Sequence, residues 1–276
     1  MRNHILIIAI GISFLLAFYG AVAYPLLRPI LALPPLPGGI FGQTLSTLLF
    51  VLVHSIYALG LRHAVAFFGA SAAITWTLEE AGVAGGWIYG GYHYTEVLGV
   101  QLGHVPILIP LSWFIYLYPS YIIVNCMIGD PPVGTHGSLW RAMWISALGG
   151  IVVTAQDLIF DPLLSGPGIQ AWVWEQGGGY FGVPTQNFLG WIITGFIVFA
   201  LYRAFERKLA PTPIGAMTPT ITTLPIIVYG FLLVTSLLDI GIAELRVVGP
   251  FVLGIPMLIA LTHVWLPREG RTISAH

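Results

Sequence analysis

Eight stretches of this chain are apolar over about 20 residues each, which is the length of helix that crosses the hydrocarbon core of a bilayer. The composition agrees, because 57% of the 276 residues are hydrophobic and only 8% are charged, whereas soluble domains are about 25% charged. We therefore predict an all-α, polytopic membrane helix bundle that forms a single domain over residues 1–276. The predicted spans are residues 4–25, 41–60, 64–81, 105–127, 140–159, 187–204, 220–239 and 247–266.

The first apolar stretch has a second interpretation. A charge at Arg2, an apolar run and the small residues Ala21-Val22-Ala23 also fit a signal peptide with its cleavage site. We favour a first spanning helix that ends at Pro25, because only a single charge precedes the apolar run.

Arginine and lysine in short loops predict the orientation of the chain, because they are enriched on the cytoplasmic side of a membrane. With the N-terminus inside, eight of the ten basic residues are cytoplasmic, and only Arg28 and Arg246 lie outside. The same orientation places eight of the eleven acidic residues at the outer side. We therefore predict a multi-pass protein of the cell membrane with an extracytoplasmic acidic face. These acidic residues are Glu79, Glu80, Glu96, Asp157, Asp161, Glu175, Asp239 and Glu244.

Two parts of the chain share a pattern that predicts an internal duplication. Each has an acidic residue near a helix end, a loop rich in Gly and aromatic residues, a Val-Pro pair and then a Trp within a helix. We predict two related helix pairs, in units of about 64–127 and 140–205. Coincidence is the alternative, because the offset was found by searching for it. Counted 78 positions apart, the matching residues are Glu79 and Asp157, Val105 and Val183, Pro106 and Pro184, and Trp113 and Trp191.

Three of the outer carboxyl groups are candidate catalytic residues, namely Glu79, Asp157 and Asp161. An ionised carboxylate costs roughly 2.5–3.5 kcal/mol at the centre of a membrane, so a carboxyl group at that depth needs a purpose. Asp157 and Asp161 are four residues apart and share one helix face, where one of them is expected to keep its proton. Glu80 is better explained as a charge at the membrane interface, where a helix ends.

The Asp157-x3-Asp161 spacing also fits a magnesium–diphosphate site of the kind found in membrane prenyltransferases. Two features argue against that alternative. The predicted outer face offers only Arg28 and Arg246 to neutralise a diphosphate, and a second Asp-rich run is missing. The histidines also lack the spacing of metal ligands, so we predict no bound metal.

Two glycine-rich loops, at about residues 85–94 and 172–191, carry aromatic side chains at the predicted outer side. An interfacial belt of Trp and Tyr accounts for some of them. Aromatic faces also stabilise a nearby cation, by about 2 kcal/mol when water is excluded, and a carbocation is such a cation. The candidate substrate-binding residues are Tyr92, His93, Tyr94, Trp172, Trp174, Tyr180, Asn187 and Trp191.

Seven short motifs between about residues 75 and 205 together resemble the integral-membrane carotenoid biosynthesis family. Characterised members of that family are carotenoid hydratases of the CruF type, including bisanhydrobacterioruberin hydratases of archaea. The motifs are Glu79-x-x-Gly82-Val83, Gly90-Gly91-Tyr92-His93-Tyr94, Gly103-His104-Val105-Pro106 followed by Trp113, Asp157-x3-Asp161-Pro162, Trp172-x-Trp174, Gly179-Tyr180-Phe181-Gly182-Val183-Pro184 and Asn187-x2-Gly190-Trp191.

The resemblance implies a cofactor-independent hydro-lyase that adds water to the terminal C=C bond of an acyclic carotenoid. A carboxylic acid would protonate the double bond to give a tertiary carbocation, and water would capture it while a carboxylate takes up a proton. The expected partners are a long apolar carotenoid, water and the lipid bilayer. Other enzymes of the carotenoid pathway are further candidate partners, and the net charge of −1 gives no indication of nucleic acid.

Two other functions stay open on the sequence alone. The same acid chemistry would serve a cyclase or an isomerase of carotenoids or other isoprenoids, since only the access of water separates these from a hydratase. A proton-coupled membrane transporter is the alternative from another class, with Asp157, Asp161 and Asp239 as relay groups. Transporters hold such groups near the membrane midplane, whereas these acids are predicted at helix ends, which favours the enzyme.

Overall fold

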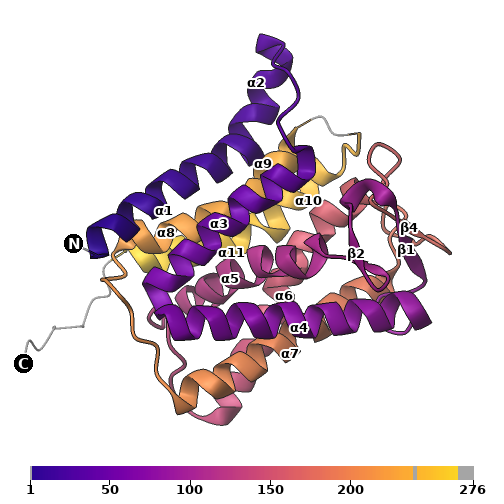
Figure 1. The fold of residues 1–276 in the computed structure, drawn as a ribbon. Helices are drawn as coiled ribbons and strands as arrows, with labels where there is room; N and C mark the ends of the chain where they lie inside the picture. Colours follow the sequence, from indigo (N-terminus) through magenta and orange to yellow (C-terminus); the bar gives the residue numbers. More distant parts are fainter. Residues whose placement is uncertain (1, 239–240, 267–276) are drawn as a thin grey trace, which may run out of the picture.

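Long helices that run roughly along one axis dominate the computed structural model, which describes residues 2–238 and 241–266 (Figure 1). The helices are α1 (Arg2–Phe18), α2 (Tyr24–Leu31), α3 (Gly39–Leu59), α4 (Leu61–Gly85), α5 (Leu108–Met127), α6 (Leu139–Leu164), α7 (Thr185–Lys208), α8 (Pro219–Tyr229), α9 (Phe231–Leu237), α10 (Leu245–Val252) and α11 (Gly254–Trp265). The shorter elements are a π-helical turn η1 (Tyr19–Ala23), a 3-10 turn η2 (Glu96–Leu98) and the strands β1 (Tyr92–Tyr94), β2 (Gln101–Leu102), β3 (Val105–Pro106) and β4 (Trp172–Trp174).

Within the described residues, six helical segments are long and apolar enough to span a membrane, and the bent pair α8–α9 makes a seventh. The remaining predicted span, residues 64–81, corresponds to α4, which has 25 residues but carries Arg62 and His63 at one end and Glu79 and Glu80 at the other. The predicted all-α, polytopic bundle is therefore confirmed. The charged residues Asp239, Arg268, Glu269 and Arg271 lie outside the described residues.

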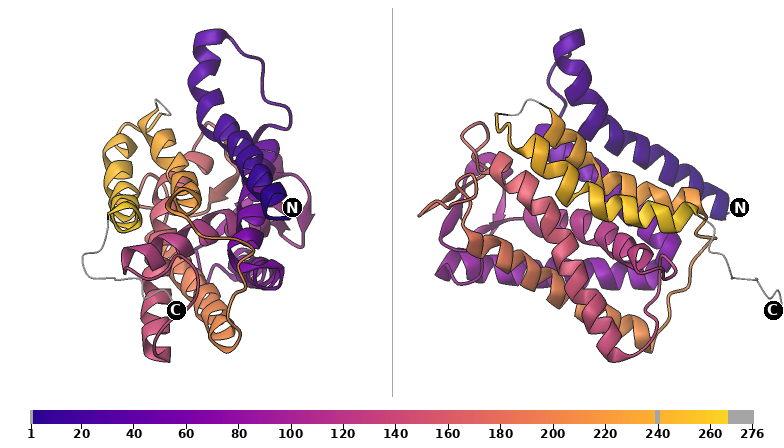
Figure 2. Two further views of the ribbon diagram at one scale, coloured as in Figure 1. Left: turned by 90° about the vertical axis from the view of Figure 1, so that its left-hand side faces the viewer. Right: turned by 180° about the vertical axis from the view of Figure 1, so that it is seen from behind.

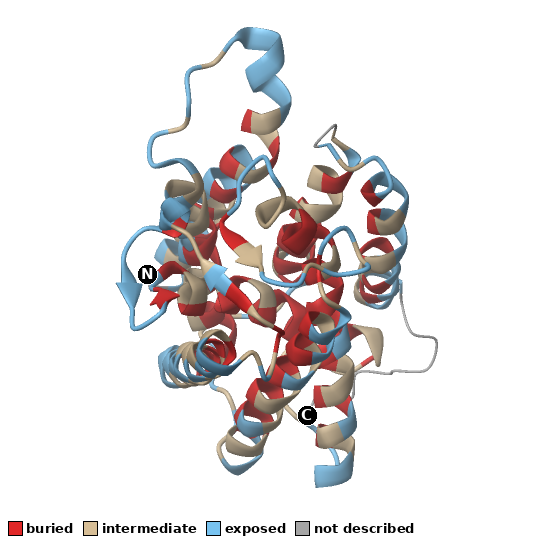
Figure 3. Cartoon of the chain, turned by 90° about the vertical axis from the view of Figure 1, so that its right-hand side faces the viewer, coloured by how far each residue is buried: buried red, intermediate tan, exposed pale blue. Residues whose placement is uncertain are grey.

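Helix α5 lies at the centre of the bundle and is buried over nearly its whole length. It packs against α3, α4, α6, α8 and α11. A helix that is apolar almost all round, as α5 is, suits a position away from water, and here other helices enclose it. Figure 3 shows the buried residues gathered along this centre, with exposed residues on the loops and the outer faces of the helices.

Glycines allow α6 and α7 to approach closely. A Cβ atom on Gly150 of α6 would lie 2.5 Å from the Ile192 carbonyl oxygen, and one on Gly195 of α7 would lie 2.7 Å from Val153 Cγ1. Small residues serve this purpose in membrane bundles, where van der Waals packing rather than the hydrophobic effect holds helices together. The contact matters for function because α6 and α7 both carry side chains of the site described below.

We expect Gly150→Ala to destabilise the bundle by about 1–3 kcal/mol, because the new methyl group meets backbone atoms that have no room to shift. The measurement is thermal unfolding of the purified protein in detergent. Gly69→Ala is the matched control, since a Cβ atom at this exposed position of α4 meets nothing within 4 Å. There the same change should be neutral or stabilising by roughly 0.5–1 kcal/mol. Equal effects of the two variants would contradict the close packing of α6 and α7.

Two short antiparallel strand pairs cover one end of the bundle, at the right-hand side of Figure 1. Strand β1 pairs with β4, so that Tyr92 lies opposite Trp174 and Tyr94 lies opposite Trp172. The second pair is the β2–β3 hairpin. The two loops that the sequence analysis singled out for their glycines and aromatic residues are therefore joined directly, although about 80 residues separate them in the sequence.

A second polar cluster is buried near the opposite end of α7. Glu206 accepts hydrogen bonds from Tyr121 Oη at 2.5 Å and from the Thr135 hydroxyl. The Arg203 guanidinium donates to Asn125 Oδ1 at 2.9 Å and lies 4.8 Å from the centre of the Tyr121 ring. These contacts tie the loop between α5 and α6 to both α5 and α7. The sequence analysis treated Arg203 and Glu206 as ordinary cytoplasmic charges, but both are almost fully buried.

Candidate active site

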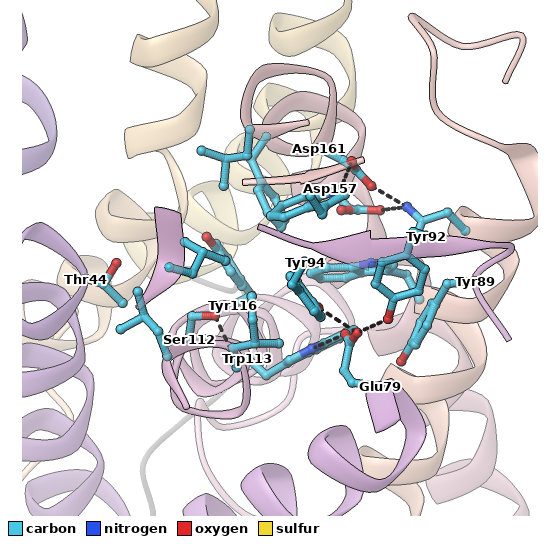
Figure 4. Close-up of a pocket in the computed structure, with 18 of the residues that line it drawn as sticks. Thr44, Glu79, Tyr89, Tyr92, Tyr94, Ser112, Trp113, Tyr116, Asp157 and Asp161 are labelled. Carbon is cyan, nitrogen blue, oxygen red and sulfur yellow. Dashed lines mark hydrogen bonds between the residues drawn. The ribbon is translucent and has the colours of Figure 1, made fainter. Parts of the chain in front are cut away.

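A cavity of about 70 Å³ lies at the strand-covered end of the bundle and has room for water. Three carboxyl groups line it, Glu79 from α4 and both Asp157 and Asp161 from α6, and none is more than 5% exposed. Figure 4 shows Glu79 on one side of the cavity and the two Asp side chains on the other. The remaining lining residues are Ile40, Thr44, Tyr89, Tyr92, Tyr94, Leu98, Leu108, Ile109, Ser112, Trp113, Tyr116, Phe160, Leu164, Trp172, Trp174, Asn187 and Trp191.

Three neutral donors hold the Glu79 carboxyl group. The hydroxyls of Tyr92 and Tyr94 donate to Oε2 at 2.5 and 2.8 Å, and Trp113 Nε1 donates to Oε1 at 3.0 Å. Burial, with the adjacent Glu79 carboxylate as a second cause, raises the pKa of both tyrosines well above 10, so their hydroxyls stay protonated and donate. A carboxylate offers about four acceptor positions, so Glu79 keeps one for a further donor such as water.

A single amide joins the two aspartates of α6. Asn187 Nδ2, at the start of α7, donates to Asp157 Oδ2 at 2.7 Å and to Asp161 Oδ2 at 2.6 Å. The other oxygen of Asp161 accepts from Trp172 Nε1 at 2.9 Å and from Trp174 Nε1 at 3.2 Å. Asp157 Oδ1, by contrast, is buried and has no hydrogen-bond partner among the described residues. The pair is thus asymmetric, with three donors on Asp161 and one on Asp157.

Aromatic rings form the walls between these carboxyl groups. Trp113 and Trp191 stack with ring centres 3.8 Å apart, and Tyr116 and Phe160 stack at 5.0 Å with nearly parallel planes. Phe160 also meets the edge of Trp191 at 5.4 Å. Aromatic rings that line a cavity stabilise a desolvated cation beside them, so this cavity combines proton donors and acceptors with walls suited to a carbocation.

Residues 40–262 match the model of a family described as carotenoid biosynthesis proteins. The chain belongs to this family. Over 158 residues it is 30% identical to the bisanhydrobacterioruberin hydratase of Haloarcula japonica, a match that covers 56% of this chain and 50% of the relative. The match thus spans about half the length of that curated relative. No solved structure matches the chain. The resemblance stated from the sequence motifs is confirmed at the level of the family.

The site of this carotenoid biosynthesis protein includes most residues predicted for substrate binding. The three candidate catalytic carboxyl groups also share one cavity, and their roles stay predictions. The predicted binding residues that line the cavity are Tyr92, Tyr94, Trp172, Trp174, Asn187 and Trp191.

The structure places two predicted binding residues, His93 and Tyr180, outside the cavity lining. His93 is exposed, and its Nδ1 lies 2.7 Å from Glu175 Oε1. It points away from the site because successive side chains of strand β1 alternate between the two faces. The Tyr180 hydroxyl donates to the Leu158 carbonyl oxygen at 3.0 Å. The composition of the two loops could not show either position, because the first depends on the β1–β4 pairing and the second on a contact with α6.

Several lining residues were absent from the predicted set. Trp113 appeared as the counterpart of Trp191 in the duplicated pattern and in one of the family motifs, and either signal could have identified it. Tyr89, Tyr116 and Phe160 carried no such signal, because an aromatic residue in an apolar helix or loop is usually part of the core.

Glu80 lies outside the cavity lining, where it accepts from the His104 backbone at 2.9 Å and lies 2.7 Å from His104 Nδ1. This position agrees with its interpretation as an interfacial charge. In the part of the chain that the structure describes, no three or more His, Cys, Asp or Glu side chains are arranged to hold a metal ion.

Proposed function

We propose that the protein is a carotenoid hydratase that adds water to the terminal C=C bond of an acyclic carotenoid. The observation that carries the proposal is the placement of Glu79 opposite the Asp157–Asn187–Asp161 unit across one buried, aromatic-walled cavity. The hydratase from Haloarcula japonica supports it by its name, over the half of that protein that the chain matches.

Asp157 is the proposed acid. Hydrogen bonds to a carboxylate favour its charged form, and Asp161 accepts three of them whereas Asp157 accepts one. Two adjacent carboxyl groups in a dry site hold one proton between them, and this asymmetry assigns it to Asp157. Its second oxygen, Oδ1, is buried and makes no hydrogen bond within the described residues, so it is the proposed position of the proton that the alkene receives.

The reaction then balances with residues of this chain and water alone. Asp157 transfers its proton to the less substituted alkene carbon, which leaves a tertiary carbocation in the cavity beside its aromatic lining. A water molecule forms the C–O bond, and Glu79 takes the proton that this water loses. Return of that proton from Glu79 to Asp157 restores the starting state, so the net change is the addition of one water to one double bond.

The acid cavity is proposed to lie near the extracytoplasmic face of the cell membrane. The support is the distribution of Arg and Lys. With the N-terminus inside, most of them fall on the cytoplasmic side, at the helix ends opposite the predicted acidic face. The duplication of residues 64–127 and 140–205 is likewise a proposal, supported by the equivalent positions of Trp113 and Trp191, which stack on each other in the site.

Expression in a host that accumulates lycopene, a linear carotenoid, tests the function. We expect pigments heavier than lycopene by one or two waters, and in deuterated water one deuterium that does not exchange at each hydrated end. A cyclase or isomerase would leave the mass in ordinary water unchanged, and a transporter would leave the pigment unaltered. Either of these results, with the protein present and folded in the membrane, would refute hydration. The uninduced host is the control.

A further inference from the structure

A second, larger cavity adjoins the site. Its volume is about 470 Å³, within the range of roughly 300–1,000 Å³ usual for pockets that hold small molecules. Segments from η1 and the start of α2, from α3, α5 and α6, and from α8 and α9 form its walls. Below it is called the groove. Its lining residues are Ala21, Pro25, Ile40, Gln43, Thr44, Thr47, Ile115, Tyr116, Gln156, Phe160, Leu163, Leu164, Ile169, Val228, Phe231, Leu232, Thr235 and Leu238.

The groove and the acid cavity meet at a neck of shared residues. Five side chains line both spaces, and they come from α3, α5 and α6: Ile40, Thr44, Tyr116, Phe160 and Leu164. Tyr116 and Phe160 lie nearly parallel there, with an angle of 11° between their planes. The neck is therefore mainly apolar, and two aromatic rings form part of its wall, which suits a planar conjugated chain.

Five polar side chains of the groove, those of Gln43, Thr44, Thr47, Gln156 and Thr235, donate hydrogen bonds within the protein. The hydroxyls of Thr44, Thr47 and Thr235 donate to backbone carbonyls one turn earlier in their own helices. The Gln156 amide donates to the Tyr116 carbonyl and to Ser120 Oγ, both at 3.2 Å. The surface that remains is mainly apolar, so it favours a hydrocarbon over a ligand that needs many hydrogen bonds.

Most of the groove comes from helices that contribute little to the acid cavity. Its walls include α3 and α8–α9, which lie outside the two proposed duplicated units, whereas the acid cavity is formed mainly by α4 to α7 and the β1–β4 pair. The right-hand view of Figure 2 shows α8 to α11 beside α1, on the side of the bundle away from α4 and α7. The groove thus takes most of its lining from outside α4 to α7, although it shares α5 and α6 with the acid cavity.

We propose that the groove binds the polyene chain of a linear carotenoid, whose end group passes through the neck into the acid cavity. The helices α3, α8 and α9 then determine which chain is accepted, while α4 to α7 carry out the reaction. This inference rests on the proposed function in one respect, namely that the end group of the carotenoid points into the acid cavity. The binding of the polyene can be tested separately from the reaction.

The test is lycopene binding by the purified protein in lipid nanodiscs, measured by the circular dichroism that a polyene acquires when a chiral site holds it. Leu232→Trp fills the groove, because Leu232 lines it. We expect this variant to lose the induced signal or to bind at least about tenfold more weakly. Leu237→Trp is the matched control, since Leu237 lies on the same helix but is 51% exposed, and it should bind as the wild type does.

A second pair of variants guards against a folding defect. Thr47→Phe places a large side chain on the facing wall formed by α3, with Leu49→Phe as the control at a neighbouring position that is 47% exposed. Thermal unfolding shows whether each variant is folded. Binding of lycopene to both groove variants with wild-type affinity would overturn the proposal, as would the absence of binding by the wild type or equal losses in the groove variants and their controls.

Hydration assayed on the same samples separates this inference from the proposed function. If the wild type binds lycopene and the groove variants do not, the groove is established even when no hydrated product forms. In that case the proposed reaction fails and the binding site stands. If the wild type hydrates lycopene and the folded groove variants hydrate it equally well, the reaction stands and the groove is refuted.

Discussion

Replacing Asp157 by Asn should abolish hydration while leaving the protein folded. The Asn side chain has nearly the same volume and its carbonyl oxygen can still accept from Asn187, but it carries no acidic proton. Loss of general acid catalysis alone costs about 10²–10⁴-fold in rate. We expect a loss at the upper end of that range or beyond, because the carbocation forms only after protonation. The measurement is the rate of hydration of lycopene by purified protein in nanodiscs.

Asp161→Asn is the informative comparison. Asp161 accepts from two Trp side chains and from Asn187, so we assign it the charged role and expect its replacement to slow the reaction less than Asp157→Asn does. The reverse order would exchange the roles of the two aspartates. Hydration at near wild-type rates by both folded variants would remove the pair from the chemistry.

Replacing Glu79 by Gln should stop the reaction after protonation rather than before it. Glu79 is the proposed acceptor of the proton from the attacking water, so its loss should slow hydration by about 10²–10⁴-fold. The carbocation would still form, and it would return a proton to Asp157 to restore the alkene. In deuterated water, Glu79→Gln should therefore place deuterium on the less substituted carbon of the terminal double bond without adding water.

This exchange distinguishes the base from the acid. Asp157→Asn should show neither hydration nor exchange, because no carbocation forms. Mass spectrometry of the recovered lycopene gives both readings at once. Glu80→Gln is the control. Glu80 is the next residue of α4, but its side chain contacts His104 and lies outside the cavity lining. If Glu79→Gln shows neither exchange nor hydration while Glu80→Gln remains active, Glu79 acts at or before protonation and is not the base.

The apolar pattern of the sequence predicted the class of fold, because a membrane imposes the same length and composition on every spanning helix. It also led to the three carboxyl groups, since a charged residue inside a long apolar run is costly enough to stand out. The spacing of four residues between Asp157 and Asp161 placed them on one helix face, and their common contact with Asn187 agrees with this.

The two strands β1 and β4 illustrate what local patterns could not predict. Each has three residues, too few to show a reliable alternation, and their partners are about 80 residues apart. Only their pairing determines that Tyr92 and Tyr94 face Glu79 while His93 faces outward. The neck at Tyr116 and Phe160 has the same origin, because α5 and α6 must pack before the two rings stack.

The sequence by itself thus determined the helical membrane architecture, the family and the acidic residues, because each depends on composition or on spacing along the chain. Tertiary structure alone decided how many donors each carboxyl group receives, which aromatic faces enclose the cavity and where the groove opens into it. These properties depend on contacts between distant helices. The distribution of hydrogen bonds over Glu79, Asp157 and Asp161, on which the assignment of acid and base rests, arises only when α4, α5, α6, α7 and the two strands come together.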